Sequence, residues 1–363
     1  MAAGSADSAG PSPADRLGAG ARRLLDLVFP PPDPNARPSS SGWRVIAAKE
    51  FADHVTSVRF VVLVIILAVA AVVPLYFASA RIRELAPQAT GQPAIFLALF
   101  TLGSEQFGFL QTDRFVALLA PLLGIAFGFD AVNVERSEGT LPRLLSQPIY
   151  RDDVINGKFA AGLAVIGVTL TSLVALIAGI GMYRLGIVPT VNEALRIVAW
   201  LFVTIAYVGF WLALATLLSV VIRRAASSAL IGFGAWLAIV IFGSLVISLI
   251  AGFLAPIPSN ATPEQQLAAA QTQQLITRLS PQTLYTEASS LLLSPFDPIS
   301  AGGFTPATIG QLIQATDQRR IPSLLSIDQS LLLIWPQVVA IIAATVVLFA
   351  LAYVAFMRQE VRA

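Results

Sequence analysis

The sequence predicts an all-α integral membrane protein with six transmembrane helices. Apolar residues make up 56% of the 363 residues and charged residues 12%, and the mean hydropathy is +0.76, which is typical of membrane proteins. Six apolar runs also reach the length of about 20 residues that a helix needs to cross a hydrocarbon core of about 30 Å. These runs are 60–79, 115–134, 159–182, 197–221, 229–254 and 331–357.

The composition excludes most enzyme chemistry. The chain has no cysteine and one histidine, so thiolate nucleophiles, Cys-ligated metals and H-E-x-x-H sites are ruled out. No G-x-S-x-G motif occurs, and no pair of acidic residues lies within the apolar runs. A net charge of +2 provides no footprint for nucleic acid. We therefore expect no catalytic residue, no bound metal or cofactor and no nucleic-acid partner.

The first 59 residues divide into two parts. Residues 1–41 are rich in Ala, Gly, Ser and Pro, which predicts a disordered cytoplasmic tail. Residues 42–59 mix apolar side chains such as Trp43 and Phe51 with charged ones such as Lys49 and Glu50. This pattern predicts a helix that lies at the cytoplasmic interface before the first span.

Lys and Arg residues in the short flanks predict the orientation, because the positive side of a membrane protein normally stays in the cytoplasm. If both termini are inside, eleven cations lie on the inner side: Arg44, Lys49, Arg59, Arg136, Arg143, Arg151, Lys158, Arg223, Arg224, Arg358 and Arg362. Five lie on the outer side: Arg81, Arg83, Arg114, Arg184 and Arg196. We therefore expect both termini in the cytoplasm.

Two outer segments are too long or too polar for plain connections. Residues 93–110 carry Glu105 and predict a short outer helix or a re-entrant segment; Glu105 faces either a substrate path or water. The loop 255–330 contains a glutamine-rich stretch, 263–279, that predicts a helix with one apolar face. We expect this loop to form an ordered extracytoplasmic cap, followed by the last span and the cytoplasmic end over 331–363.

The loop 135–158, between the second and third spans, is the most informative stretch. Gly139 is expected to break the preceding helix and Thr140 to cap a new short one, which Pro148 ends. Leucines at spacings of three and four would line one face of that short helix: Leu141, Leu144 and Leu145. Charged residues flank it on both sides: Glu135, Arg136, Glu138, Arg143 and Arg151. A short helix of this kind that faces the cytoplasm offers a docking surface.

Three further features have both a structural and a functional interpretation. Asp130, near the inner end of the second span, is expected to reach the interface or to pair with a cation such as Arg136 rather than to relay protons. Gly124 and Gly128 form a small-x-x-x-small pair that would allow close helix approach, for example at a dimer seam. His54 is expected to be a polar-face residue.

The loop resembles the signature of type 2 ABC transporter permeases, and most closely the branch that includes the membrane subunit of the nitrous-oxide-reductase maturation transporter. The matching residues are Glu135, Arg136, Glu138, Gly139, Thr140, Leu141, Leu144, Leu145, Ser146, Gln147, Pro148, Arg151, Gly157 and Lys158. Weaker matches are the pair Lys49-Glu50 and, in the outer loop, Ser280-Pro281, Leu284-Tyr285, Glu287 and Ser294-Pro295. The resemblance covers about residues 43–357, and it implies that the loop carries a coupling helix onto a separately encoded ATP-binding subunit.

The resemblance also implies that the membrane spans and the ATP-binding site belong to separate chains. The chain has no G-x-x-x-x-G-K-[ST] loop to cradle phosphates, so ATP and Mg would be bound by the partner ATPase. The implied unit has two permease copies, as a homodimer or a heterodimer, in the plasma membrane of a prokaryote, and it couples ATP hydrolysis to export or to an extracytoplasmic partner. An ion-coupled secondary transporter is the alternative, although spans almost free of charge at their centres argue against it.

Overall fold

The structure is a computed structural model, and it describes residues 42–89, 95–102, 111–137, 139, 150–256, 262–294 and 326–358. All regular elements within these residues are helices. The predicted disordered tail, 1–41, lies outside the described residues, as does Glu105.

The prediction of six spans is confirmed. Six helical segments of the described residues are long and apolar enough to cross a membrane: Val58–Ala80, Thr112–Ser137, Arg151–Leu185, Val191–Val221, Ala225–Phe242 and Ile327–Met357. The chain is therefore a multi-pass membrane protein.

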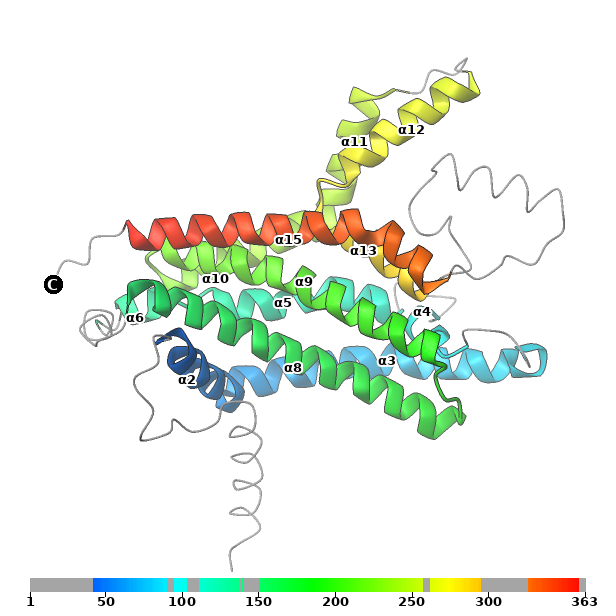
Figure 1. Ribbon diagram of the computed structural model, residues 1–363, viewed down its shortest axis with the longest axis horizontal. Helices are drawn as coiled ribbons and strands as arrows, with labels where there is room; N and C mark the ends of the chain where they lie inside the picture. Colours follow the sequence, from blue (N-terminus) through cyan, green and yellow to red (C-terminus); the bar gives the residue numbers. More distant parts are fainter. Residues whose placement is uncertain are drawn as a thin grey trace, which may run out of the picture.

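Helix α9 (Val191–Val221) is the centre of the bundle. It packs against α5 (Thr112–Gly128), α8 (Arg151–Leu185) and α15 (Ile327–Met357) (Figure 1). Its start is defined by a capping box, in which the Thr190 hydroxyl accepts from the Glu193 backbone N–H and the Glu193 carboxylate accepts from the Thr190 N–H. Aromatic side chains on α9 fill the core, since Trp200 and Trp211 are fully buried.

Helix α2 (Gly42–Thr56) lies in the segment 42–59, where a helix is expected before the first span. It lies across the start of α8 (Figure 1). A small apolar cluster gathers here from five segments that are distant in sequence: Ile46, Val132, Val154, Ile155, Val220, Ala352 and Phe356. The segments that the charge pattern assigns to the inner side thus meet at one end of the bundle.

The first two spans differ in regularity. Helix α3 (Val58–Ala89) is continuous. The second span is interrupted near its C-terminal end, because α5 ends at Gly128, turns follow over 129–132, and the short helix α6 (Asn133–Ser137) begins after them. The expected uninterrupted run over 115–134 is therefore replaced by a helix, a turn and a second short helix.

The fifth span also changes geometry along its length. Helix α10 (Ala225–Leu237) continues through a π-helical turn, η1 (Ala238–Phe242), into α11 (Gly243–Leu254). Helix α11 lies beside α12 (Pro263–Thr277), and the pair extends away from the bundle (Figure 1). Helix α12 confirms the helix expected over 263–279.

Two further helices lie at the end of the bundle opposite α2. Helix α4 (Ala98–Thr101) is the described part of the segment expected to be a short outer helix. Helix α13 (Pro281–Leu293), from the loop 255–330, packs between α9 and α15 with Tyr285 and Leu292 fully buried. This part of the loop belongs to the core because its apolar side chains are buried among the spans.

Candidate functional site

Four of the eleven residues predicted to contact an ATPase lie in the described residues, and they flank the rest of the loop. These are Glu135, Arg136, Gly139 and Arg151. The other seven lie outside the described residues: Glu138, Thr140, Leu141, Arg143, Leu144, Leu145 and Pro148. Gly139 has φ +67°, a left-handed conformation that favours glycine and agrees with the expected helix break.

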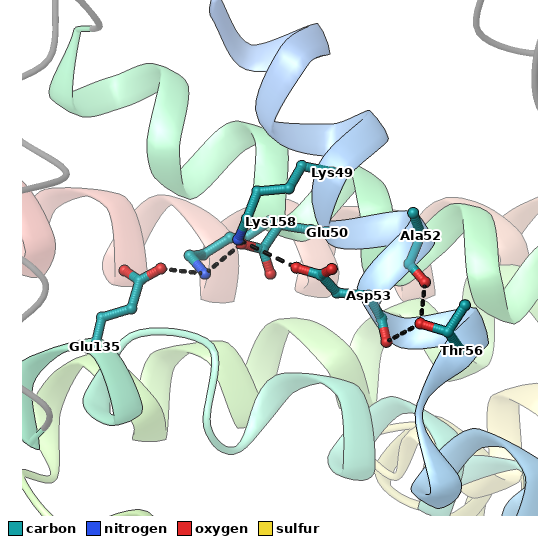
Figure 2. A network of polar contacts seen from close by, with 7 residues as sticks. All are labelled: Lys49, Glu50, Ala52, Asp53, Thr56, Glu135 and Lys158. Carbon is teal, nitrogen blue, oxygen red and sulfur yellow. Dashed lines mark hydrogen bonds and ion pairs between the residues drawn. The ribbon is translucent and has the colours of Figure 1, made fainter.

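The two ends of the loop are joined by an ion pair. Lys158 on α8 places its Nζ 2.8 Å from Glu135 Oε1 on α6 and 3.0 Å from Glu50 Oε1 on α2 (Figure 2). All three side chains are largely buried, with exposed fractions of 7% for Lys158, 13% for Glu50 and 18% for Glu135. One cation therefore connects three helices at the end of the bundle where α2 lies.

The neighbouring glycine explains how α2 comes so close to α8. A Cβ atom at Gly157 would lie 2.8 Å from the Trp43 carbonyl oxygen and 2.8 Å from Ile46 Cβ. Only glycine allows this approach without displacing the backbone of α2. Gly157 thus allows α2 to cross α8 closely, and this crossing brings the Glu50 carboxylate within reach of Lys158.

Glu50 belongs to a chain of alternating charges on α2. Lys49 Nζ lies 3.2 Å from Glu50 Oε1 and 3.2 Å from Asp53 Oδ2 (Figure 2). Burial alone would raise the pKa of Glu50, but the nearby charge of Lys158, followed by that of Lys49, holds it below its usual value. Burial opposes the charged form of Lys49, yet Glu50 and Asp53 raise its pKa. Glu50 and Lys49 are therefore both charged near neutral pH.

Arg136 and Arg151 face the ends of other helices. Arg136 donates from Nη1 to the Val220 carbonyl at 3.5 Å, at the end of α9. Arg151 donates from Nη2 to the Phe356 carbonyl at 3.5 Å, at the end of α15, and its guanidinium lies 5.7 Å from the Phe356 ring centroid. Cations are favourable at helix C-termini, where carbonyl groups are unpaired. Both arginines therefore tie the loop region to the bundle.

The turn before α6 is anchored to the end of α9. Ser219 Oγ accepts hydrogen bonds from the backbone N–H groups of Val132 at 2.9 Å and Asn133 at 3.3 Å. Asn133 Nδ2 in turn donates to the carbonyls of Phe129 at 3.1 Å and Ile222 at 3.4 Å. These bonds satisfy backbone groups that the break in the second span leaves free.

Asp130 pairs with a different cation than expected. The Arg59 guanidinium, not that of Arg136, lies 2.7 Å from Asp130 Oδ2 and also donates to the Ala126 carbonyl at 3.2 Å. The expectation of an interfacial ion pair holds, but the partner comes from the start of α3 because the turn after α5 brings the two together. His54 contacts the Phe127 ring edge to face, with 5.0 Å between centroids.

The glycine pair in the second span packs within the chain. A Cβ at Gly124 would lie 2.5 Å from the Val208 carbonyl oxygen, and one at Gly128 would lie 2.9 Å from the Leu212 carbonyl oxygen. Both neighbours are on α9. The close helix approach is therefore confirmed, but it joins α5 to α9 of the same chain rather than forming a dimer seam.

A second polar network lies at the opposite end of the bundle, around α13. The buried Arg196 donates to Asn192 Oδ1, Ser330 Oγ and the carbonyls of Leu291 and Leu292, over 2.8–3.5 Å. Sequence analysis counted Arg196 only as an outer flanking charge, because its burial depends on α13 folding back onto α9. Its partners at the end of α13 come from nearly a hundred residues further along the chain.

Aromatic side chains complete the network around α13. Tyr207 and Tyr285 stack with 4.4 Å between ring centroids, and the Trp200 indole N–H donates to Ser289 Oγ at 2.8 Å. The Tyr207 hydroxyl donates to Gln282 Oε1 at 3.1 Å. Burial raises the pKa of Tyr285 well above its usual value, so this phenol stays protonated. Among the described residues, no three acidic or histidine side chains gather in a way that could hold a metal ion.

The residues that sequence reasoning left out of the site are Glu50 and Lys158. The signal for both was available, since the pairs Lys49-Glu50 and Gly157-Lys158 each matched the permease pattern. The pattern did not predict that Lys158 of one pair binds Glu50 of the other.

The sequence is similar to known proteins in two comparisons. The family described as "ABC-2 family transporter protein" matches residues 44–361, most of the 363-residue chain. The chain is also similar to the probable ABC transporter permease protein NosY of Stutzerimonas stutzeri, with 29% identity over 157 residues. That alignment covers 40% of this chain and 55% of the relative, so the chain spans about half the length of the curated relative it matches.

Proposed function

Because this chain belongs to the ABC-2 family of transporter proteins, we propose that it is the membrane-spanning subunit on which a separately encoded ATPase acts through the loop 135–158. The observation that carries the proposal is the ion pair between Glu135 and Lys158, which joins the two ends of that loop. Because this pair fixes the two ends of the loop relative to each other, a displacement of the loop is transmitted to the helices at both ends rather than lost as bending of the loop.

Contacts made by residues near the two ends of the loop would carry that displacement to other helices. Lys158 pairs with Glu50 on α2, Arg136 donates to a carbonyl at the end of α9, and Arg151 donates to a carbonyl at the end of α15. ATP and Mg would be held entirely by the partner, and ATP-driven closure of two ATPase subunits would move two permease copies. The copies are either identical or related chains.

The same proposal gives the chain an orientation and a setting. Helices α2 and α6 and the end of α15 lie at one end of the bundle, which we assign to the cytoplasm with both termini (Figure 1). We assign the protein to the plasma membrane of a prokaryote, with substrate export as the direction. The pair of α11 and α12 extends away from the side of the bundle (Figure 1), and we assign its surface to an extracytoplasmic partner.

Affinity purification of the tagged chain from its native host tests the ATPase partner. We expect a soluble ATPase to co-purify with the wild-type chain and to be lost from the Glu138→Ala, Arg143→Ala double variant. A matched control, Glu264→Ala with Arg184→Ala, removes the same two charge types at exposed positions outside the loop and should retain the ATPase.

A different outcome would favour the alternative. If the wild-type chain is pure, stable and transports a substrate without any ATPase, the permease assignment of the loop is wrong. A response of that transport to an ion gradient would then identify an ion-coupled secondary transporter.

A further inference from the structure

We propose that helix α11 lies in the lipid of the leaflet away from α2, so that α12 is the helix of this pair that faces a partner outside the membrane. Lipid contact of this kind requires only that the chain spans a bilayer. In the orientation assigned above the leaflet is the outer one, and that name for it rests on the proposed function.

The surface of α11 divides into a seam and a wide apolar part. Ala251 is buried and Ile247 is partly buried, and residues four apart share one face of a helix. Since α11 packs on α12, this face is the seam between them, and Gln273 Nε2 closes it with a hydrogen bond to the Ala255 carbonyl at 2.7 Å. The apolar part is exposed and carries large side chains: Leu245, Val246, Leu249, Ile250, Phe253 and Leu254.

These side chains cover more than one face of the helix. At about 100° of rotation per residue, the row that contains Leu249 and Phe253 lies opposite the seam, and the row that contains Ile250 lies on one flank. A helix that is apolar over so much of its surface is normally buried in protein or membrane. Fluid lipid can surround both faces at once, whereas a protein surface that packs on a helix contacts mainly one.

The described side chains of α11 also offer a protein partner no free hydrogen-bond donor. The Ser248 hydroxyl donates to the Leu245 carbonyl of its own helix at 2.8 Å. Protein interfaces typically carry about one hydrogen bond per 100–200 Å². In hydrocarbon, by contrast, each polar group must be satisfied within the protein, as this hydroxyl is. The chemistry of the surface therefore favours lipid over a second copy or another chain.

The length of the fifth span explains why α11 leaves the side of the bundle. The 18 residues of Ala225–Phe242 rise about 27 Å, close to the thickness of about 30 Å of the hydrocarbon core. Helix α11 adds 12 apolar residues, and no charged residue occurs in the sequence between Arg224 and Glu264. Continued along the membrane normal, α11 would carry Phe253 into water. The pair instead extends sideways after the π-helical turn η1, and such turns often kink a helix (Figure 1).

Helix α12 has the opposite character. Polar side chains predominate among its exposed residues: Glu264, Gln265, Gln266, Gln271 and Thr272. A pair with one apolar and one polar helix suits the membrane surface, with α11 toward the acyl chains and α12 toward water. The extracytoplasmic partner proposed above would therefore bind the α12 side of the pair.

The absence of cysteine from the sequence allows a direct test with spin labels. Single variants place a label on α11 (Leu249→Cys or Phe253→Cys) or at exposed positions of α12 (Ala268→Cys or Thr272→Cys). The full-length chain, with its co-purified ATPase, is reconstituted in vesicles of phosphatidylethanolamine and phosphatidylglycerol. Electron paramagnetic resonance then measures collisions of each label with oxygen, which concentrates in lipid, and with a water-soluble nickel chelate.

Two references define the scale. A phospholipid labelled in its acyl chain gives the values for lipid, and Ala213→Cys, at a fully buried position of α9, gives those for the protein interior. We expect the Leu249→Cys and Phe253→Cys labels to match the labelled lipid in oxygen collisions. Their collisions with the nickel chelate should be several-fold fewer than those of the Ala268→Cys and Thr272→Cys labels.

Two results would overturn the proposal. Nickel collisions at Leu249→Cys and Phe253→Cys as frequent as at Thr272→Cys would place α11 in water. Few collisions with either reagent, as at Ala213→Cys, would show that a second copy or another protein covers it. Neither result bears on the ATPase partner, which co-purification tests separately.

Discussion

The Glu287 carboxylate and the Gln337 side-chain amide, fifty residues apart in the chain, lie 3.0 Å apart inside the bundle. Glu287 is 4% exposed and also accepts from Arg278 Nε at 2.8 Å. The Gln337 bond holds α13 against α15, and the Arg278 bond ties the residue after α12 to α13, so this end of the bundle depends on a carboxyl side chain that has almost no access to water.

Removal of this carboxylate should destabilise the protein. In Glu287→Ala, the buried Gln337 amide loses its acceptor, and an unsatisfied buried polar group costs about 1–3 kcal/mol. We expect a lower unfolding temperature in detergent for Glu287→Ala and no change for Glu264→Ala, an exposed glutamate on α12. Equal unfolding temperatures for both variants would show that α13 is not held through Glu287.

Arg196 should matter for a related reason. Its guanidinium donates hydrogen bonds to acceptors on α9, at the end of α13 and at the start of α15. The variant Arg196→Met would remove this donor from all three. We expect a loss of about 1–3 kcal/mol in unfolding free energy, measured as a shift in denaturant midpoint. The exposed Arg184 on α8 supplies the control, because Arg184→Met should leave the midpoint in place.

The glycine pair of α5 predicts a position-dependent effect of a single methyl group. Gly124→Ala would place a Cβ 2.5 Å from the Val208 carbonyl oxygen and force α5 away from α9. We expect a lower unfolding temperature, in line with the 1–3 kcal/mol or so that overpacking typically costs. Gly179→Ala on α8, where nothing lies within 4 Å of the added atom, should have little effect. A change in oligomeric state with no loss of stability would contradict the intramolecular assignment.

The Glu50–Lys158 pair predicts a dependence of stability on pH. Because the folded state lowers the pKa of Glu50, its contribution is present above the unfolded pKa of about 4.3 and is lost as the pH falls through the lower folded value. Unfolding temperatures measured below about pH 5 should therefore fall more steeply for wild type than for Glu50→Gln. Parallel curves for the two proteins would mean that Glu50 has the same pKa in the folded and unfolded states.

Much of the fold follows from local sequence. A run such as 331–357 is apolar over the whole thickness of a bilayer, and a helix there satisfies its own backbone groups, so no tertiary contact is needed to specify it. The helix α2, the glutamine-rich α12 and the break at Gly139 follow from residue type in the same way.

The loop signature also contains residues that the structure brings together. Glu135 lies at its start and Lys158 at its end, and Lys158 also pairs with Glu50 of the matching pair Lys49-Glu50. Which lysine pairs with which glutamate did not follow, because the partners are separated by up to 108 residues and any of several cations had the right charge. For the same reason, the sequence did not identify Arg59, rather than Arg136, as the partner of Asp130.

By itself, then, the sequence determined six spans, their flanking charges and a distinctive loop between the second and third spans, since these depend on hydropathy and residue type over short stretches. Only the tertiary structure decided that α13 is part of the core, that Gly124 packs on α9, and that Lys158 joins Glu50 to Glu135. Those outcomes depend on which helices lie side by side, and side-chain packing between distant segments sets that arrangement.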